Sequence, residues 1–234
     1  MKKNILYLSA LVVLMLGFVG CKKESKGLTR ITTYAELELL GDNPLLLAKG
    51  SEFVDPGALA FMGEQDVTDQ IKVTGSVDPT TSGVYQLTYK VINPDGFEAS
   101  ASRTVVVADP NMPLEGLWVT DPASYRVNSG GAPVLYGAPF NIVILANVDG
   151  TYFIEDLLAG WYCQRAGYGS NYAMQANIAL ADDGTVSLID SYVPGWGDSA
   201  DALDGAVYDA TAGTLTYKVT YAGTLDFYVT LIKQ

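Results

Sequence analysis

Short runs of apolar and β-branched residues, separated by turn residues, recur along the chain from about residue 31. The clearest run, Val84 to Ile92, alternates in polarity and is followed by the turn Asn93-Pro94-Asp95-Gly96 and a returning run, Ala101 to Val107. Alternation with a period of two is typical of a half-buried strand, and a turn between two such runs predicts a hairpin. With further runs at Leu45-Leu46-Leu47 and Ile71-Lys72-Val73, residues 31–109 have the spacing of an antiparallel β-sandwich.

The segment from Leu114 to Gln234 shows the same pattern with more strands. Strands are predicted around residues 116–120, 140–147, 152–156, 160–164, 173–181, 185–191, 214–220 and 224–233. Asp149-Gly150, Asp183-Gly184 and Ala222-Gly223 stand at hairpin positions between them, so this segment is a meander. A meander of about eight strands hides its edges by closing as a sandwich or a small barrel. The chain is therefore predicted to be all-β: an immunoglobulin-like β-sandwich followed by an antiparallel β-sandwich or small β-barrel.

The remaining segments are predicted to link the two domains, to direct the chain to export and to tether it. Residues 110–113 contain two prolines and no periodicity, which predicts a short, stiff linker. Met1-Lys2-Lys3 precedes an apolar stretch from Ile5 to Val19, which is shorter than the roughly 20 residues of a membrane-spanning helix. This pattern favours a secretory signal peptide over residues 1–20 rather than a membrane anchor helix. Residues 21–30 are polar and are predicted to be a flexible tether.

Cys21 directly follows the predicted signal peptide. The segment Phe18-Val19-Gly20-Cys21 resembles the bacterial lipobox, although Phe18 stands where Leu is usual. The resemblance implies that Cys21 is lipidated, becomes the first residue of the mature chain and holds the protein on a membrane through its acyl chains. Each buried methylene adds about 0.8 kcal/mol of membrane affinity. The alternative is a disulfide between Cys21 and Cys163, which a cysteine at a processing site disfavours, so that Cys163 is expected to be a lone packed thiol.

The first predicted domain carries an ordered set of glycines, aspartates and β-branched residues. The set comprises Gly50, Phe53, Asp55-Pro56-Gly57-Ala58, Asp66-Val67-Thr68, Val73, Gly75, Val77-Asp78, Gly83-Val84-Tyr85, Leu87-Thr88-Tyr89, Val91, Asn93, Gly96 and Arg103-Thr104-Val105-Val106-Val107. On these residues the segment resembles the immunoglobulin-like domains of bacterial surface proteins, in particular those of Bacteroidetes lipoproteins. The resemblance implies a spacer or interaction module. Asp55, Asp66 and Asp78 are expected to cap turns rather than to bind calcium.

The C-terminal segment has a looser resemblance. The residues on which this resemblance rests are Gly116-Leu117-Trp118, Asp149-Gly150-Thr151-Tyr152, Gly160-Trp161-Tyr162 and Leu215-Thr216-Tyr217. They resemble the uncharacterised second domains that follow such immunoglobulin-like modules in Bacteroidetes outer-membrane lipoproteins, which are associated with nutrient uptake systems of the starch-utilisation type. The resemblance implies a lipid-anchored protein of the outer membrane, exposed at the cell surface, with an outer-membrane transporter complex as a partner.

Composition narrows the chemistry. The 234 residues contain no histidine, which removes the Ser-His-Asp arrangement and the commonest zinc ligand, and no cofactor or metal is expected. A net charge of −12 disfavours nucleic acid and polyanionic glycans. Asp198, Asp201 and Asp204 recur every three residues, which predicts a solvated loop or helical turn rather than a calcium loop. Glu155 and Asp156 are adjacent on a predicted strand, so they are expected to point to opposite faces and not to form a catalytic pair.

Two glycine-rich stretches concentrate aromatic residues, Gly160 to Tyr172 and Ser191 to Asp198. Exposed rings supply flat contact area at low entropic cost, and neighbouring amide or guanidinium groups supply hydrogen bonds, which suits a neutral glycan or a peptide. The candidate ligand-binding residues are Trp161, Tyr162, Arg165, Tyr168, Asn171, Tyr172, Tyr192 and Trp196. The alternative is that these aromatics fill the core. Trp196, between two glycines, is the best candidate for exposure.

These observations favour a non-catalytic, membrane-anchored lipoprotein. It is predicted to bind an extracellular nutrient polymer, glycan or peptide, or to serve as an accessory subunit of an outer-membrane nutrient transporter. The alternative from another class is a structural or assembly lipoprotein that docks a partner protein. A carboxylate-dependent glycoside hydrolase is the least favoured hypothesis.

Overall fold

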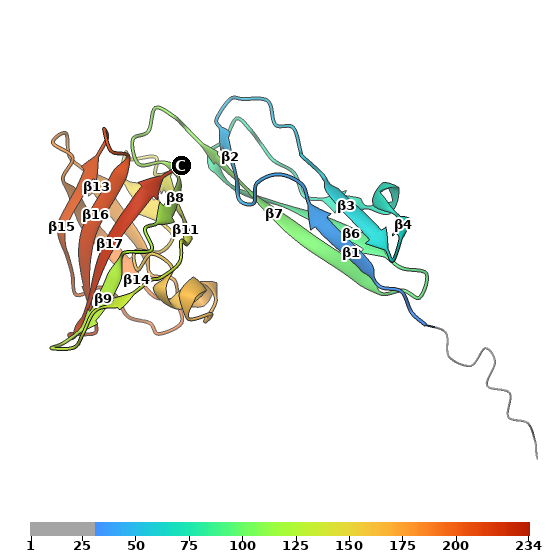
Figure 1. Cartoon of the computed structure of the whole chain (residues 1–234). Coiled ribbons are helices and arrows are strands. Elements are labelled where there is room, and N and C mark those ends of the chain that lie inside the picture. Colours follow the sequence, from blue (N-terminus) through green and yellow to red (C-terminus); the bar gives the residue numbers. More distant parts are fainter. Residues whose placement is uncertain (1–30) are drawn as a thin grey trace, which may run out of the picture. The chain divides into compact units, whose positions relative to one another are not determined.

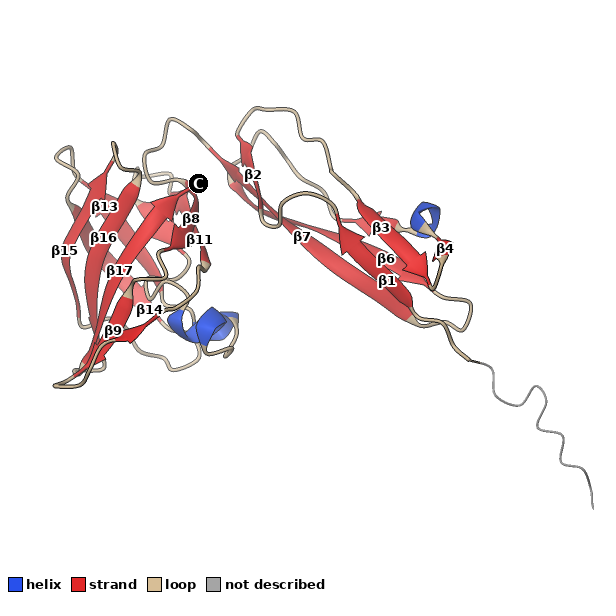
Figure 2. Cartoon of the chain, viewed as in Figure 1, coloured by secondary structure: helices blue, strands red, loops and turns tan. Residues whose placement is uncertain are grey.

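The computed structural model describes residues 31–234, and strands make up most of its regular structure (Figure 1, Figure 2). The prediction of an all-β chain is therefore confirmed. The predicted signal peptide, Cys21 and the predicted tether lie outside the described residues. Among residues 31–234, no helix combines the length and the apolar character needed to cross a membrane.

The first part of the chain forms two sheets. One contains β1 (Ala35–Leu39), β3 (Ala58–Met62) and β4 (Gln65–Asp66), and the other contains β2 (Leu45–Ala48), β7 (Glu98–Ala108), β6 (Gly83–Ile92) and β5 (Lys72–Thr74). The predicted hairpin is confirmed, because β6 pairs antiparallel with β7 from Gly83 opposite Val107 to Ile92 opposite Glu98. The expectation of a purely antiparallel sandwich was wrong for β2, which runs parallel to β7. After β1 the chain leaves one sheet and enters the other as β2, instead of returning beside β1 as a hairpin.

Three aspartates of this part cap turns, as predicted. Each accepts a hydrogen bond from the backbone N–H two residues later, at 2.9–3.0 Å, in the pairs Asp55–Gly57, Asp66–Thr68 and Asp78–Thr80. The bond from Thr68 lowers the pKa of Asp66, and the bonds from Thr80 lower that of Asp78. A carboxylate that already serves its own turn has little capacity left for a calcium ion.

Arg103 is fully buried beneath these turns, with an exposed side-chain fraction of 0%. Its guanidinium group donates hydrogen bonds to the backbone carbonyls of Asp42, Leu40 and Gly57. The Asp55 carboxylate lies 3.6 Å from the Arg103 Nε. One side chain therefore connects β7 to segments 46 to 63 positions earlier in the chain, and the planar fork of an arginine suits this task.

The second part of the chain forms one sheet that closes on itself (Figure 1). One run of antiparallel neighbours is β8 (Gly116–Thr120), β11 (Asn141–Ala146), β12 (Tyr152–Ile154), β13 (Gln175–Leu180) and β14 (Val186–Tyr192), and the other is β15 (Ala202–Asp209), β16 (Thr214–Tyr221) and β17 (Leu225–Lys233). β17 pairs back to β8. A bridge between Thr185 and Val207, with a 2.8 Å hydrogen bond from the Tyr208 N–H to the Gly184 carbonyl, joins β14 to β15. The meander is thus a small barrel.

Three features of the barrel differ from the predicted pattern. The predicted strand at 160–164 is a π-helical turn, η2 (Trp161–Arg165), followed by a 3-10 turn, η3 (Ser170–Tyr172), because Gly160 has a φ of 87° and turns the chain out of the extended conformation. The loop or helical turn predicted around Asp198, Asp201 and Asp204 ends at Ala202, where β15 begins. The pairing of β15 with β16 is interrupted by a bulge between Asp204 and Val207. A further hairpin, β9 (Tyr125–Asn128) and β10 (Val134–Leu135), continues the sheet beside β17.

The barrel interior is filled by side chains. Trp118, Ile142, Ile154 and Phe227 are fully buried, and the Trp118 Nε1–H donates a 2.8 Å hydrogen bond to the Leu114 carbonyl. Burying each large apolar side chain contributes about 1.5–3 kcal/mol. A ligand must therefore meet this domain at an end of the barrel or on its outer face.

Candidate functional site

The two aromatic stretches singled out in the sequence lie against each other at one end of the barrel. The Gly195 N–H, in the connection between β14 and β15, donates a 2.6 Å hydrogen bond to the Asn171 carbonyl, in the connection between β12 and β13. A Cβ atom on Gly195 would lie 2.6 Å from the Tyr172 ring. The glycine therefore allows the ring to pack directly on the second loop.

Asp156 organises the first of these loops. Its Oδ1 accepts hydrogen bonds from the backbone N–H groups of Leu158 and Met174, both at 2.9 Å, and its Oδ2 accepts from the Gly160 N–H at 2.8 Å and the Cys163 thiol at 3.0 Å. The carboxylate is buried, which raises its pKa, whereas these four bonds lower it. In a sheet, such backbone N–H groups would bond to a neighbouring strand. In this loop the Asp156 carboxylate is their acceptor instead.

Five rings meet at this end of the barrel and are called the aromatic end cluster: Tyr162, Tyr168, Tyr172, Trp196 and Tyr221. Trp196 is at its centre, with ring centroids 4.8 Å from Tyr162, 4.9 Å from Tyr172 and 6.3 Å from both Tyr168 and Tyr221. Trp196 is 41% exposed and Tyr168 is 56% exposed. The cluster thus has a buried base and an exposed top.

Trp161 was predicted to contact a ligand, but its side chain is buried. It is 3% exposed, and its ring packs on Tyr136 and Phe227, with centroids 4.8 and 5.7 Å away. The guanidinium carbons of Arg126 and Arg165 lie 4.7 and 4.3 Å from its ring centroid. The loop folded by Asp156 turns this ring inward, so Trp161 supports the cluster from below, and Arg165 packs over it.

Of the other candidate ligand-binding residues, some belong to the aromatic end cluster and the rest lie beside it. Tyr192 is exposed and lies outside the aromatic end cluster. Asn171 contributes its backbone carbonyl to the contact between the loops.

Sequence reasoning missed Tyr221, the fifth ring of the cluster. Tyr217, Val219 and Tyr221 alternate at the end of β16, and this pattern places Tyr221 on the inner face, next to the end of the barrel. Its hydroxyl donates to the Asp198 carboxylate at 2.9 and 2.8 Å. Burial and then this contact with Asp198 raise the pKa of Tyr221. Asp198 is thereby fixed beside the rings as a hydrogen-bond acceptor.

Glu155 and Asp156 line a common cavity of about 250 Å³ near η2, together with Cys163. The expectation that these two carboxylates are kept apart by strand geometry was wrong, because β12 ends at Ile154 and the chain bends there. Asp156 nevertheless has its oxygens occupied by four protein donors. Glu155 Oε1 accepts a 2.8 Å hydrogen bond from the Val143 N–H, and burial raises its pKa to about 7.

Glu155 makes stability depend on pH. Its pKa rises from the ordinary value of 4.5 to about 7 on folding, so between these values the folded chain retains a proton that the unfolded chain releases. We expect the free energy of unfolding to fall, by about 3 kcal/mol at most, as the pH rises through this window. Glu155→Gln keeps an acceptor for Val143 and should remove this slope, as measured by urea unfolding at pH values on either side of the window. Glu52→Gln, at an exposed position, serves as the control, and an unchanged slope in Glu155→Gln would contradict the assignment.

Within the described residues, no group of three or more His, Cys, Asp or Glu side chains is arranged to hold a metal ion. Cys163 is a free thiol, and burial followed by the neighbouring Asp156 carboxylate raises its pKa. A thiol with a raised pKa is a weak nucleophile. Cys163 therefore acts as a hydrogen-bond donor within the loop.

Comparison with known proteins places this architecture in a class. A model of the immunoglobulin-like domain of bacterial surface proteins matches residues 37–107, and a family model of a C-terminal domain matches residues 108–233. The chain is thus similar to bacterial surface proteins in its immunoglobulin-like domain, which precedes the small barrel. It belongs to the same family as the lipoprotein BT2262 of Bacteroides thetaiotaomicron. The crystal structure of that protein is 41% identical and matches with a TM-score of 0.75 over 86% of this chain and 100% of the other.

A further comparison adds nothing to this assignment. A structure from Clostridium perfringens ZmpB, containing CBM51-2 in complex with GlcNAc and INT domains, covers 85% of this chain and 44% of its own, at 12% identity and a TM-score of 0.29. Similarity at that level carries no argument about fold or ligand. None of the curated proteins compared with the chain matches it.

Proposed function

We propose that the chain is a lipid-anchored, non-catalytic binding protein that presents the aromatic end cluster to a neutral glycan or a peptide. Cys21 would carry the acyl chains, in keeping with the lipobox resemblance and with the similarity to a lipoprotein. Neither matching family model describes a catalytic domain. The aspartate in the loop cavity serves the loop fold rather than a reaction.

The exposed top of the aromatic end cluster carries this proposal. Trp196 and Tyr168 present ring surface to solvent, while Tyr162, Tyr172 and Tyr221 hold them in place from the sides and below. Rings fixed in advance lose little conformational freedom on binding. A net charge of −12 makes a neutral ligand a better match than a polyanion.

The membrane and the partner are part of the same proposal. An outer-membrane location, exposed at the cell surface, would bring the cluster to extracellular polymers, and an outer-membrane nutrient transporter of the starch-utilisation type would be its partner. The resemblance to Bacteroidetes lipoproteins and the match to a surface-protein domain support this placement. A role in docking a partner protein is the second candidate, since exposed rings at a barrel end also suit a protein contact.

Trp196→Ala tests the proposal. We expect it to weaken binding at least tenfold, because the central exposed ring of the cluster is lost, and to change the Tm by only a few degrees, because this ring is 41% exposed. Binding is measured by titration calorimetry with malto-, xylo- and manno-oligosaccharides and with casein peptides. Phe97→Ala, which removes an exposed ring from the immunoglobulin-like domain, is the matched control and should bind normally.

Two outcomes would contradict the proposal. A large loss of Tm with unchanged affinity would assign Trp196 to the core. Absence of binding to every probe, combined with stoichiometric co-purification of a membrane protein that Trp196→Ala abolishes, would favour the docking role.

A further inference from the structure

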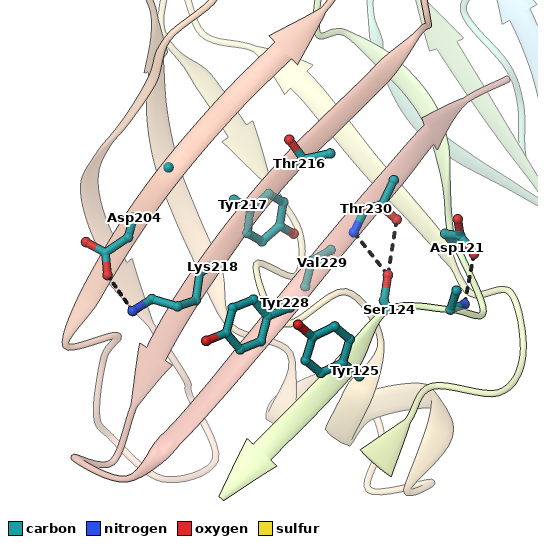
Figure 3. Close-up of a pocket in the computed structure, with 12 residues that line it drawn as sticks. Asp121, Ser124, Tyr125, Asp204, Thr216, Tyr217, Lys218, Tyr228, Val229 and Thr230 are labelled. Carbon is teal, nitrogen blue, oxygen red and sulfur yellow. Dashed lines mark hydrogen bonds and ion pairs between the residues drawn. The ribbon is translucent and has the colours of Figure 1, made fainter. Parts of the chain in front are cut away.

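A row of side chains crosses the outer face of the barrel at right angles to its strands (Figure 3). The pairing registers place five residues side by side on β15, β16, β17, β9 and β10: Asp204, Lys218, Tyr228, Tyr125 and Leu135. We call this set the cross-strand row. Its members face outward, because the neighbouring residues of β17, Phe227 and Val229, are buried inside. Four strand spacings of about 4.8 Å give the row a length of about 19 Å.

Two tyrosines form the centre of the cross-strand row. The ring planes of Tyr125 and Tyr228 are 15° apart and their centroids are separated by 4.7 Å. Figure 3 shows the two rings next to each other above β17 and β9. Tyr228 is 36% exposed. The two rings are therefore stacked on each other, and the pair presents ring edges and an outer ring face to solvent; the electron-rich faces of aromatic rings attract the C–H groups of a sugar.

Charged and hydroxyl groups lie beside this surface. Lys218 Nζ lies 2.9 Å from the Asp204 carboxylate and 4.0 Å from that of Asp226, and the hydrogen bond that Lys218 donates to Asp204 raises the pKa of Lys218. The tyrosines, Lys218 and Asp204 line the same cavity of about 470 Å³ as Thr216 and Thr230. Donors and acceptors of hydrogen bonds are thus available next to the flat rings, as a polyhydroxylated ligand requires.

The supporting backbone is fixed. The Thr230 N–H donates a 3.0 Å hydrogen bond to Ser124 Oγ, and the Asp121 N–H donates a 2.8 Å bond to the Thr230 carbonyl, so the start of β9 is tied to β17. The Tyr125 ring is consequently held beside Tyr228 before any ligand arrives. A surface arranged in this way binds with a small entropic cost.

We infer that the cross-strand row is a second binding surface, for a neutral glycan chain. A sugar ring would lie against the exposed edge and outer face of the stacked pair Tyr125 and Tyr228, and its hydroxyl groups would bond to Lys218 and Asp204. The length of the row suits an oligosaccharide rather than a single sugar, and the adjacent carboxylates disfavour a polyanion. The row shares no residue with the aromatic end cluster, and it rests on the proposed function only for the idea that the ligand is a nutrient glycan.

The test uses the full chain in mild detergent on native gels cast with amylose, xylan, laminarin or mannan. We expect at least one polysaccharide to retard the wild type, Tyr228→Ala to lose at least tenfold in affinity, and Tyr228→Phe to bind as the wild type does because the ring remains. Unchanged Tm values would show that the variants are folded. Retardation by none of the four polysaccharides, or equal retardation of Tyr228→Ala and wild type, would overturn the inference.

Trp196→Ala on the same gels separates this inference from the proposed function. Normal retardation of Trp196→Ala with loss in Tyr228→Ala would support the cross-strand row and remove glycan binding from the aromatic end cluster. Loss in Trp196→Ala with normal retardation of Tyr228→Ala would overturn the cross-strand row and leave the proposed function standing.

Discussion

Arg103→Ala is expected to unfold the immunoglobulin-like domain at urea concentrations at which the barrel remains folded. The substitution leaves the carbonyls of Leu40, Asp42 and Gly57 without their buried donor, and it removes the cation next to Asp55. Leaving a buried hydrogen-bonding group without its partner costs about 1–3 kcal/mol, and three carbonyls lose theirs. Since a small domain has a total stability of about 5–15 kcal/mol, this loss is a large share of it.

The tryptophans make the two domains separately observable. All three, Trp118, Trp161 and Trp196, lie in the barrel, so their fluorescence reports on the barrel while far-UV circular dichroism reports on both domains. In Arg103→Ala, we expect the dichroism signal of the immunoglobulin-like domain to be lost at lower urea concentration. The fluorescence transition of the barrel should stay where it is in the wild type. Arg103→Lys, the matched control, retains a charge near Asp55 but cannot serve three carbonyls, and it should recover only part of the loss. A wild-type transition in Arg103→Ala would refute the structural role given to this side chain.

Asp156→Ala should produce the complementary result, a shift of the fluorescence transition. It deprives the backbone N–H groups of Leu158, Gly160 and Met174 of their buried acceptor. Each unsatisfied buried donor costs about 1–3 kcal/mol, and we expect a total loss of about 3–5 kcal/mol because the loop relaxes in part. The loop carries Trp161, so the loss should appear as earlier exposure of a tryptophan in urea.

Cys163→Ala is the matched control for Asp156→Ala. It removes the thiol donor alone and leaves the three backbone bonds to the carboxylate in place. Its expected cost is below about 1.5 kcal/mol. Equal losses in the two variants would show that the carboxylate does not organise the loop through the backbone.

Local patterns predicted those parts of the fold that depend on neighbouring residues. The hairpin of β6 and β7 follows from alternation and its turn, and the Asp149-Gly150, Asp183-Gly184 and Ala222-Gly223 turns each connect paired strands. The closure of the meander into a barrel was one of two predicted outcomes. Which of them occurs depends on contacts between β14 and β15, and on those between β8 and β17, which local periodicity does not encode.

The candidate site was predictable in composition but not in orientation. Trp161 and Trp196 both stand beside glycines, yet one is buried and the other exposed. The difference arises because the Asp156 carboxylate, which the sequence places on a strand, gathers donors from up to 18 positions away and turns the loop inward. Tyr221 joins the rings from a strand that lies far along the chain, and the cross-strand row exists only once the registers of five strands are known.

Closure of the barrel also affects how copies of the chain behave next to one another. An open eight-strand meander would end in two long strands with unpaired N–H and C=O groups, and such edges pair readily with those of neighbouring molecules. The pairing of β17 with β8 removes the edges at the two ends of the meander, and the bridge at Thr185 and Val207 brings β14 next to β15. A lipid anchor would confine many copies to two dimensions at high local concentration. Under that crowding, a meander whose terminal strands pair with each other offers fewer free edges to neighbouring copies than an open one.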